Sequence, residues 1–117
     1  MTAWTFTVPG QPVPKGRPRL AEGRVYTPKR TKDYELKVAQ YALAAGVRCA
    51  PKGQQVGLEI EVCYKRDMDL DNAEKSALDG LNGIAYADDR QVVELISSKA
   101  PSLNPRLIVS IHWMEVP

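Results

Sequence analysis

Histidine and cysteine are scarce in this chain of 117 residues, which contains only His112, Cys49 and Cys63. Two cysteines without a CxxC spacing support neither a disulfide framework nor a zinc site, and we expect both to pack as small hydrophobic side chains. The sequence has no recognisable Ser/His/Asp or Cys/His set for covalent catalysis. His112 is predicted to be a surface residue without a catalytic role.

Long hydrophobic runs are also absent from the sequence. No apolar run approaches the roughly 20 residues that span a bilayer, and the first residues, Met1 to Trp4, lack the basic and apolar regions of a signal peptide. We therefore expect a cytoplasmic protein. The length fits one domain spanning residues 1–117, and a lone domain this short buries only about two thirds of its unfolded surface. We expect a homodimer interface to add apolar burial.

Charge is unevenly distributed, although the net charge is only +2. Residues 1–48 contain nine Lys or Arg and three Asp or Glu, a balance of +6, whereas residues 49–117 contain seven basic and eleven acidic residues, a balance of −4. The acids concentrate further between Asp67 and Asp89. This distribution indicates a basic face for a polyanion and an acidic site for cations. Ordinary solvated surface with uneven charge is the alternative.

Hydrophobic periodicity predicts a single α+β domain. Strands are expected near residues 4–8, 24–26, 55–64, 91–99 and 106–113. One helix should run to Gly46 with Thr27 as its cap and Pro28 in its first turn, and a second from about Asn72 to Leu81. The core-facing helix residues are predicted to be Tyr34, Val38, Tyr41, Ala42, Ala45, Ala73, Ala77, Leu78 and Leu81. Residues 11–19 should form a loop, because proline removes ladder donors. The expected architecture is a mixed sheet of about five strands covered by two helices.

Three aspartates, Asp67, Asp69 and Asp71, recur at a spacing of two. Wherever the backbone is extended, this spacing places the side chains on one side of the chain. Carboxylates so close repel one another, and a divalent cation among them removes this cost. Oxygen ligands without His or Cys favour magnesium, with manganese as the alternative. The later pair Asp88–Asp89, in a turn before an apolar strand, is predicted to complete the site.

Structural roles compete with this metal-site interpretation. Asp71 stands where the second helix begins, with Glu74 three residues later as a capping-box partner, so it is equally compatible with a helix cap. Lys75, one turn beyond Asp71, either forms an ion pair with it or projects into the same pocket as a cation. Asp88 and Asp89 also suit an ordinary turn.

Several short motifs together resemble one known family. They are Pro12-Val13-Pro14-Lys15-Gly16-Arg17-Pro18-Arg19, Tyr26-Thr27-Pro28, Asp69-Leu70-Asp71-Asn72 followed by Lys75 and Leu78-Asp79, and Asp88-Asp89-Arg90-Gln91-Val92. Their order and joint occurrence resemble the RusA family of Holliday junction resolvases, the crossover junction endodeoxyribonucleases of bacteria and their phages. The resemblance implies a homodimeric, magnesium-dependent endonuclease that makes paired symmetric nicks in four-way DNA junctions during recombination and repair.

The resemblance also implies roles for individual residues. The catalytic carboxylates that bind the metal correspond to Asp69, Asp71 and Asp89, and the catalytic lysine corresponds to Lys75. The stretch between Asp79 and Asp88 is one residue shorter than in the family pattern, which leaves Asp88 as the alternative to Asp89. Magnesium there would lower the pKa of a bound water, and the lysine would offset charge on the phosphoryl oxygens.

A basic N-terminal surface is predicted to contact DNA. Proline stiffens its first part, and Gly16 permits close approach of the backbone to a phosphate. The predicted DNA-contacting residues are Lys15, Arg17, Arg19, Arg24, Lys29, Arg30 and Lys32. A mobile basic loop is the alternative for the first part. Met68, between two aspartates, is predicted to wedge against base pairs where a junction opens, and a core position is its alternative.

Three other functions stay open from the sequence. A less selective nuclease for branched DNA could use the same carboxylates. A DNA-binding protein without catalysis would use them as caps and turn residues, but binding alone gains nothing from carboxylates near phosphates. A magnesium phosphohydrolase of small substrates would not need the basic N-terminal segment.

Overall fold

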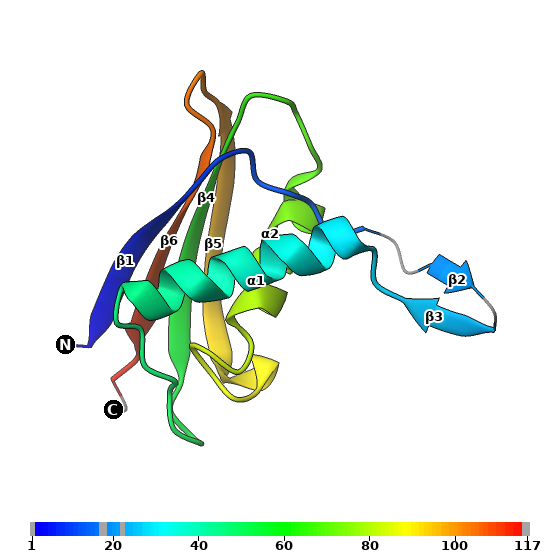
Figure 1. The fold of residues 1–117 in the computed structure, drawn as a ribbon. Coiled ribbons are helices and arrows are strands. Elements are labelled where there is room, and N and C mark those ends of the chain that lie inside the picture. Colours follow the sequence, from blue (N-terminus) through cyan, green and yellow to red (C-terminus); the bar gives the residue numbers. More distant parts are fainter. Residues whose placement is uncertain (1, 17–18, 22, 116–117) are drawn as a thin grey trace.

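A four-stranded mixed sheet with two helices across one face forms the body of the protein (Figure 1). The structure, a computed structural model, describes residues 2–16, 19–21 and 23–115. The elements are β1 (Ala3–Pro9), β2 (Arg19–Ala21), β3 (Arg24–Tyr26), α1 (Lys29–Ala44), β4 (Val56–Tyr64), α2 (Leu70–Leu81), a short 3₁₀ helix η1 (Asp89–Gln91), β5 (Val92–Pro101) and β6 (Arg106–Trp113). The predicted α+β class is confirmed.

The main sheet has the strand order β1-β6-β4-β5. β4 and β5 are parallel, and the other two neighbouring pairs are antiparallel. Along β4, Leu58 and Ile60 are buried under the helices, whereas Glu59 and Glu61 are exposed on the opposite face. This alternation is expected of a strand with one covered face. β5 lies at an edge and is exposed along most of its length.

α1 covers the sheet with a narrow buried stripe. Its buried residues are Thr31, Tyr34, Val38 and Ala42. Tyr41 and Ala45 were predicted on this face and are exposed, because the contact surface is narrower than the apolar pattern. The helix begins after Pro28 without a side-chain cap, so the predicted capping by Thr27 is wrong. Gly46, at φ 84°, follows the helix end as expected.

α2 begins two residues earlier than predicted, because Asp69 is its N-cap. Its buried residues include Ser76 and Gly80, which the apolar pattern does not identify, and Leu78 is only half-buried. A Cβ atom at Gly80 would lie 2.8 Å from the backbone oxygen of Glu35 in α1. The absence of that atom permits the close contact between the two helices.

The strand predicted at residues 24–26 forms, but it lies outside the main sheet. β3 pairs with β2 in a separate hairpin, which projects beyond the start of α1 (Figure 1). β2 begins at Arg19, the last residue of the predicted loop, and its other two residues were assigned to no element in the sequence analysis. Strands of three residues are too short to give a recognisable hydrophobic alternation, which is why the sequence did not predict their pairing.

Both tryptophans of the chain lie at one end of the sheet. The rings of Trp4 in β1 and Trp113 in β6 meet edge to face with centroids 5.9 Å apart. The guanidinium carbon of Arg48 lies 5.8 Å and 5.6 Å from the two centroids. Aromatic and cation–π contacts therefore join the first and last strands of the sheet to the segment that follows α1.

The two cysteines and the histidine lie outside the predicted acidic site. Cys63 is buried as expected, whereas Cys49 is exposed, contrary to the prediction. The ring of His112 lies over Gly57 on the open face of the sheet, and its Nε2 is 3.5 Å from Glu94. None of the helices in the described part of the chain has the length and apolar character needed to cross a membrane.

Candidate active site and nucleic-acid surface

The first group of predicted acidic residues lies where β4 leads into α2. β4 ends at Tyr64, residues 65–69 are irregular, and the helix starts at Leu70. Asp71 is therefore already in the first helical turn. The spacing of Asp67, Asp69 and Asp71 predicts that an extended backbone places all three side chains on one side. The backbone is not extended through all three residues, because α2 begins before Asp71.

Asp69 is held in place by the start of α2. One carboxylate oxygen accepts the backbone N–H of Asp71 at 3.2 Å, and the other accepts the side-chain amide of Asn72 at 3.3 Å. A negative charge is favourable at this end of a helix. The residue is exposed, and carboxylate oxygens have further lone pairs for another ligand. The alternative role of Asp71 as the helix cap, with Glu74 as its capping-box partner, is wrong, because Asp69 is the N-cap and Glu74 accepts a hydrogen bond from Ser97 in β5.

Asp67 is engaged by a cation of the same chain. Its carboxylate accepts hydrogen bonds from Lys99 at 2.9 Å and from the backbone N–H of Met68 at 2.8 Å. These two bonds lower the pKa of Asp67, and the bond to Asp67 raises the pKa of Lys99. Asp67 therefore serves as the partner of Lys99 and is less available to a metal ion than Asp69.

Asp71 and Lys75 are both exposed on α2. Neither takes part in any ion pair found among residues 2–16, 19–21 and 23–115, so the predicted alternative of a pair between them is not formed. The Lys75 side chain is thus able to approach an external anion from a position one helical turn beyond Asp71.

The second acidic pair lies at the opposite end of α2. Asp88 caps η1: it accepts the backbone N–H of Arg90 at 2.9 Å and pairs with the Arg90 guanidinium at 3.2 Å, and both contacts lower the pKa of Asp88. Asp89 accepts the amide of Asn82 at 3.1 Å. Because the Asp88 carboxylate is used as a cap, Asp89 is the more available of the two.

One chain does not bring all the predicted metal ligands together. Asp69 is the N-cap of α2, and Asn82, which contacts Asp89, is its C-cap. A helix of this length separates its two ends by about 18 Å at 1.5 Å per residue. Within the described residues, no group of three His, Cys, Asp or Glu side chains is placed to hold a metal ion.

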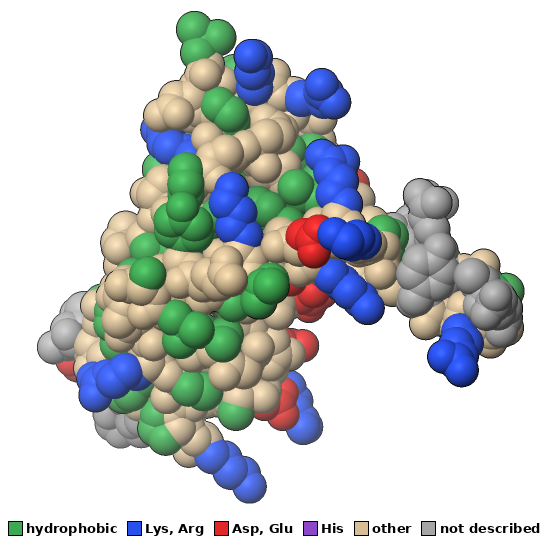
Figure 2. Space-filling view, in the orientation of Figure 1, with side chains coloured by type: hydrophobic (Ala, Val, Ile, Leu, Met, Phe, Trp, Pro, Cys, Tyr) green, Lys and Arg blue, Asp and Glu red, His purple; other side chains and the backbone are tan. Residues whose placement is uncertain are grey.

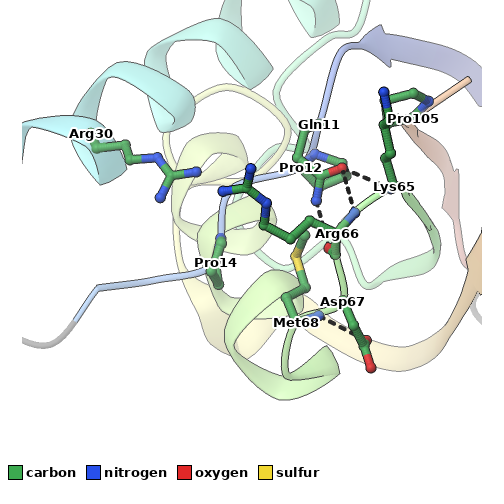
Figure 3. Close-up of a pocket in the computed structure, with 9 residues that line it drawn as sticks. All are labelled: Gln11, Pro12, Pro14, Arg30, Lys65, Arg66, Asp67, Met68 and Pro105. Atoms are coloured by element: carbon green, nitrogen blue, oxygen red, sulfur yellow. Dashed lines mark hydrogen bonds between the residues drawn. The ribbon is translucent and has the colours of Figure 1, made fainter.

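A pocket of about 650 Å³ opens beside Met68 (Figure 3). Its lining residues are Gln11, Pro12, Pro14, Arg30, Lys65, Arg66, Asp67, Met68 and Pro105. Figure 3 shows the guanidinium groups of Arg30 and Arg66 facing each other across the space. Since Asp67 is paired with Lys99, the cations dominate the lining, and the pocket is suited to a phosphate group.

Lys65 and Arg66 are candidate binding residues that sequence reasoning did not identify. A pair of basic residues after a strand is common and does not by itself indicate a binding site. The sequence signal that could have identified this pair is its position directly before the acidic segment that starts at Asp67. Met68 is half-buried and packs against the hydrophobic core, as its alternative interpretation predicts.

Residues 11–16, called the strap here, are fixed across the start of α2. The side chain of Gln11 accepts the backbone N–H of Lys65 and donates to the carbonyl of Arg66, both at 2.8 Å. The hydroxyl of the buried Ser76 donates to the Val13 carbonyl at 2.6 Å. The strap is therefore an ordered wall of the pocket, and the alternative of a mobile loop does not describe it.

Lys15 ties the strap to both helices. Its ammonium group is 3.0 Å from Glu35 and 2.8 Å from Asp79, and its side chain is only 21% exposed. Burial opposes the charge, but the hydrogen bonds to Asp79 and Glu35 outweigh it and raise the pKa of Lys15. The next residue, Gly16, donates its N–H to Thr31 at 3.0 Å. Lys15 thus meets two carboxylates of its own chain in place of the predicted phosphate.

The other predicted DNA-contacting residues lie around the start of α1. Arg24, Lys29, Arg30 and Lys32 are exposed, and Lys29 pairs with Asp33 at 2.8 Å. Figure 2 shows Lys and Arg side chains over the upper part of one face and on the projecting hairpin. Arg17 and the side chain of Arg19 lie outside the described residues.

Comparison with known proteins identifies the family of this chain. The model of the endodeoxyribonuclease RusA family matches residues 9–112, which include the strap, the pocket and both acidic groups. The uncharacterized protein YqaN of Bacillus subtilis (strain 168) is 31% identical over 135 aligned positions, covering 92% of this chain and 94% of the relative. The chain therefore belongs to the RusA family of endodeoxyribonucleases.

Proposed function

We propose that this protein is a magnesium-dependent endonuclease that resolves four-way DNA junctions by paired symmetric nicks, acting as a homodimer in recombination or repair. Membership of an endodeoxyribonuclease family supports cleavage of DNA. The observation that carries the proposal is the position of two exposed carboxylates, Asp69 and Asp71, directly after the residues of a cationic pocket. Such a surface offers one region for phosphates and one for a metal ion.

The donor set at the start of α2 fits magnesium. Asp69 and Asp71 offer only oxygen atoms, and magnesium commonly uses one or two carboxylates together with waters and substrate phosphates. Manganese has the same preference for oxygen ligands. Bound there, the metal would supply a water of lowered pKa and stabilise the oxygen that leaves the phosphodiester. Asp89 is the third proposed ligand.

The remaining residues of the chain would bind and orient the DNA strand. Arg30, Lys65 and Arg66 contact phosphates at the pocket, and the hydrogen bonds of the strap to residues 65 and 66 keep two of these cations in place. Lys75 offsets negative charge on the phosphoryl oxygens. The two hydrogen bonds that Asp69 accepts orient its carboxylate before any ligand binds.

Cleavage of a labelled four-way junction, compared with a matched linear duplex, tests the proposal. We expect symmetric nicking of the junction that requires magnesium and stops with a chelator. Asp69→Asn keeps a side chain that caps helices well, so folding and junction binding should persist while cleavage is lost. Glu59→Gln, on the open face of the sheet, is the control and should cleave normally.

The other outcomes identify the competing functions. Equal cleavage of junction and duplex would indicate a less selective nuclease. Tight DNA binding by a wild-type protein that never cleaves would indicate a binding protein, and metal-dependent hydrolysis of small phosphate esters alone would indicate a phosphohydrolase. Normal cleavage by Asp69→Asn would remove this residue from the active site.

A further inference from the structure

The side chain of Gln91, at the end of η1, binds the backbone of two separate segments. Its oxygen accepts the backbone N–H groups of Ala87 and Asp88 at 2.9 and 3.0 Å. Its amide nitrogen lies 3.3, 3.0 and 3.0 Å from three carbonyl oxygens, those of Ala50, Pro51 and Gln54. One side chain therefore joins residues 87–88 to a loop that lies 37 to 41 positions earlier in the chain.

Gln91 supports the part of the chain that carries Asp89. Before this part, Tyr86 is fully buried, and its hydroxyl donates to the Leu78 carbonyl at 2.7 Å. After it, β5 begins directly behind Gln91. Residues 87–90, between these two anchors, are exposed. The hydrogen bonds of Gln91 hold the two residues directly before Asp89 against the body of the protein.

The side chain at position 91 has to donate and accept hydrogen bonds at once. Glutamine does both, because its amide has an oxygen that accepts and an NH₂ group that donates. An ionised glutamate only accepts, and its carboxylate would face the three carbonyl oxygens that the amide nitrogen binds. A methionine side chain has a similar length but offers no comparable donor or acceptor.

The other acidic group is supported in the same way. Gln11 of the strap binds the backbone of residues 65 and 66, which directly precede the first carboxylates. Gln91 binds the backbone of residues 87 and 88, which directly precede Asp89. Groups that orient metal ligands commonly change metal affinity or activity by about 10–100-fold when they are replaced. The repetition of this support at both groups of proposed ligands favours a role of Gln91 in metal binding.

We propose that Gln91 is a positioning residue for metal binding by Asp89. It fixes residues 87–88 against the loop of residues 50–54, so that the Asp89 carboxylate is in place before a metal ion binds. This inference rests on the function proposed above, in which Asp89 is the third ligand. A residue that only stabilised the fold would leave the metal affinity of the folded protein unchanged.

Direct binding of Mn²⁺, measured from the electron paramagnetic resonance signal of the free ion, tests this role without DNA cleavage. Gln91→Met should bind Mn²⁺ about tenfold more weakly than the wild type. Gln54→Met is the matched control, because the Gln54 amide donates to the carbonyl oxygens of Gln55 and Met114 at 2.9 and 2.8 Å. It removes hydrogen bonds of the same loop and should keep wild-type affinity. Unchanged affinity in a folded Gln91→Met protein would overturn the proposal.

Two further measurements apply to the backbone contacts of Gln91. Amide hydrogen exchange at Ala87 and Asp88 should be faster in Gln91→Met than in Gln54→Met, because the acceptor of both N–H groups is lost. Unchanged exchange there would refute the positioning. Gln91→Glu keeps the acceptor and loses the donor, so it should also weaken Mn²⁺ binding, and it replaces the methionine variant in the same assay if that variant does not fold.

A double-mutant cycle tests whether Gln91 acts through Asp89. Asp89→Asn should weaken Mn²⁺ binding by itself. Adding Gln91→Met to it should cause no further loss, because the carboxylate that Gln91 positions is no longer present. A further loss of about tenfold in the double variant would mean that Gln91 acts elsewhere, and the proposal would fail.

Cleavage of the labelled junction separates this inference from the proposed function. The magnesium concentration for half-maximal cleavage by Gln91→Met should rise about tenfold, while the rate at saturating magnesium stays close to that of the wild type. A wild type that binds Mn²⁺ in a Gln91-dependent manner but cleaves no DNA would refute only the nuclease function. A wild type that resolves junctions, beside an Asp89→Asn protein with unchanged Mn²⁺ affinity, would overturn only the role of Gln91.

Discussion

Replacing Lys15 by methionine tests whether the strap is a structural brace. The ammonium group lies 3.0 Å from Glu35 in α1 and 2.8 Å from Asp79 in α2. Methionine retains much of the aliphatic stem but removes the charge. Both carboxylates therefore lose their shared cation, and the strap loses its ionic connection to the two helices.

The expected decrease in the free energy of unfolding is about 1–2 kcal/mol. Hydrogen bonds to charged groups contribute about 1.5–3 kcal/mol where they are shielded, whereas exposed ion pairs contribute about 0.2–1 kcal/mol. The side chains of Lys15, Glu35 and Asp79 are 21%, 20% and 36% exposed, which places them between these limits. In a domain of this size the melting temperature should fall by about 4–8 °C.

Urea unfolding followed by circular dichroism measures this difference. Lys29→Met is the control, because the side chains of Lys29 and its partner Asp33 are 88% and 61% exposed and their ion pair should contribute far less to stability than the contacts of Lys15. Since the pKa of Lys15 is raised in the folded protein, its contribution is present below its ordinary value of 10.5 and is lost as the pH rises through the raised pKa. Equal stability of the two variants would refute the brace. So would a decrease of about one in the salt slope of DNA binding on Lys15→Met, which would indicate a phosphate contact.

Three further predictions concern other parts of the structure. Gly80→Ala should destabilise the fold by about 1–3 kcal/mol in thermal denaturation, despite better helix propensity, because the new Cβ meets backbone 2.8 Å away; a stabilised variant would contradict this. Lys65→Gln combined with Arg66→Gln should weaken DNA binding and reduce the salt slope by about two, and an unchanged slope would exclude the pocket from the DNA surface. Lys99→Met should raise the pKa of Asp67 toward its ordinary value in an NMR titration. In the wild type this ion pair stabilises the fold above the ordinary pKa of Asp67 and is lost as the pH falls through the lowered pKa, so a variant with an unshifted Asp67 would refute the assignment.

The regular elements of the main sheet could be predicted because one covered face imposes a strict alternation. β4 and β6 show it clearly, with Leu58, Ile60, Val109 and Ile111 buried at every second position. The hairpin of β2 and β3 has no face covered by a helix, so the sequence shows no alternation that would predict its pairing. Helix boundaries were less predictable, because Asp69 and Asp71 are equally good caps and the backbone geometry decides between them.

The identity of the acidic residues could be predicted, but their arrangement was not. The predicted helix between the two groups already implies a separation of its full length, so the sequence contained a signal that one chain would not unite Asp69 and Asp89. The contacts of Lys15, by contrast, could not be predicted from the sequence. Its two partners lie 20 and 64 positions further along the chain, on separate helices, and no local pattern specifies such a meeting.

The paired tryptophans give the protein a built-in optical probe. Trp113 lies beside Val56 at the start of β4, whereas the cationic pocket begins directly after β4 ends, about 30 Å away along the strand. A nucleic acid seated at the pocket is therefore too distant to quench the indole emission by contact. Intrinsic fluorescence reports instead on the contact between the first and last strands and on Arg48, which lies against both rings. Folding can thus be recorded from emission while binding is recorded from a label on the DNA in the same sample.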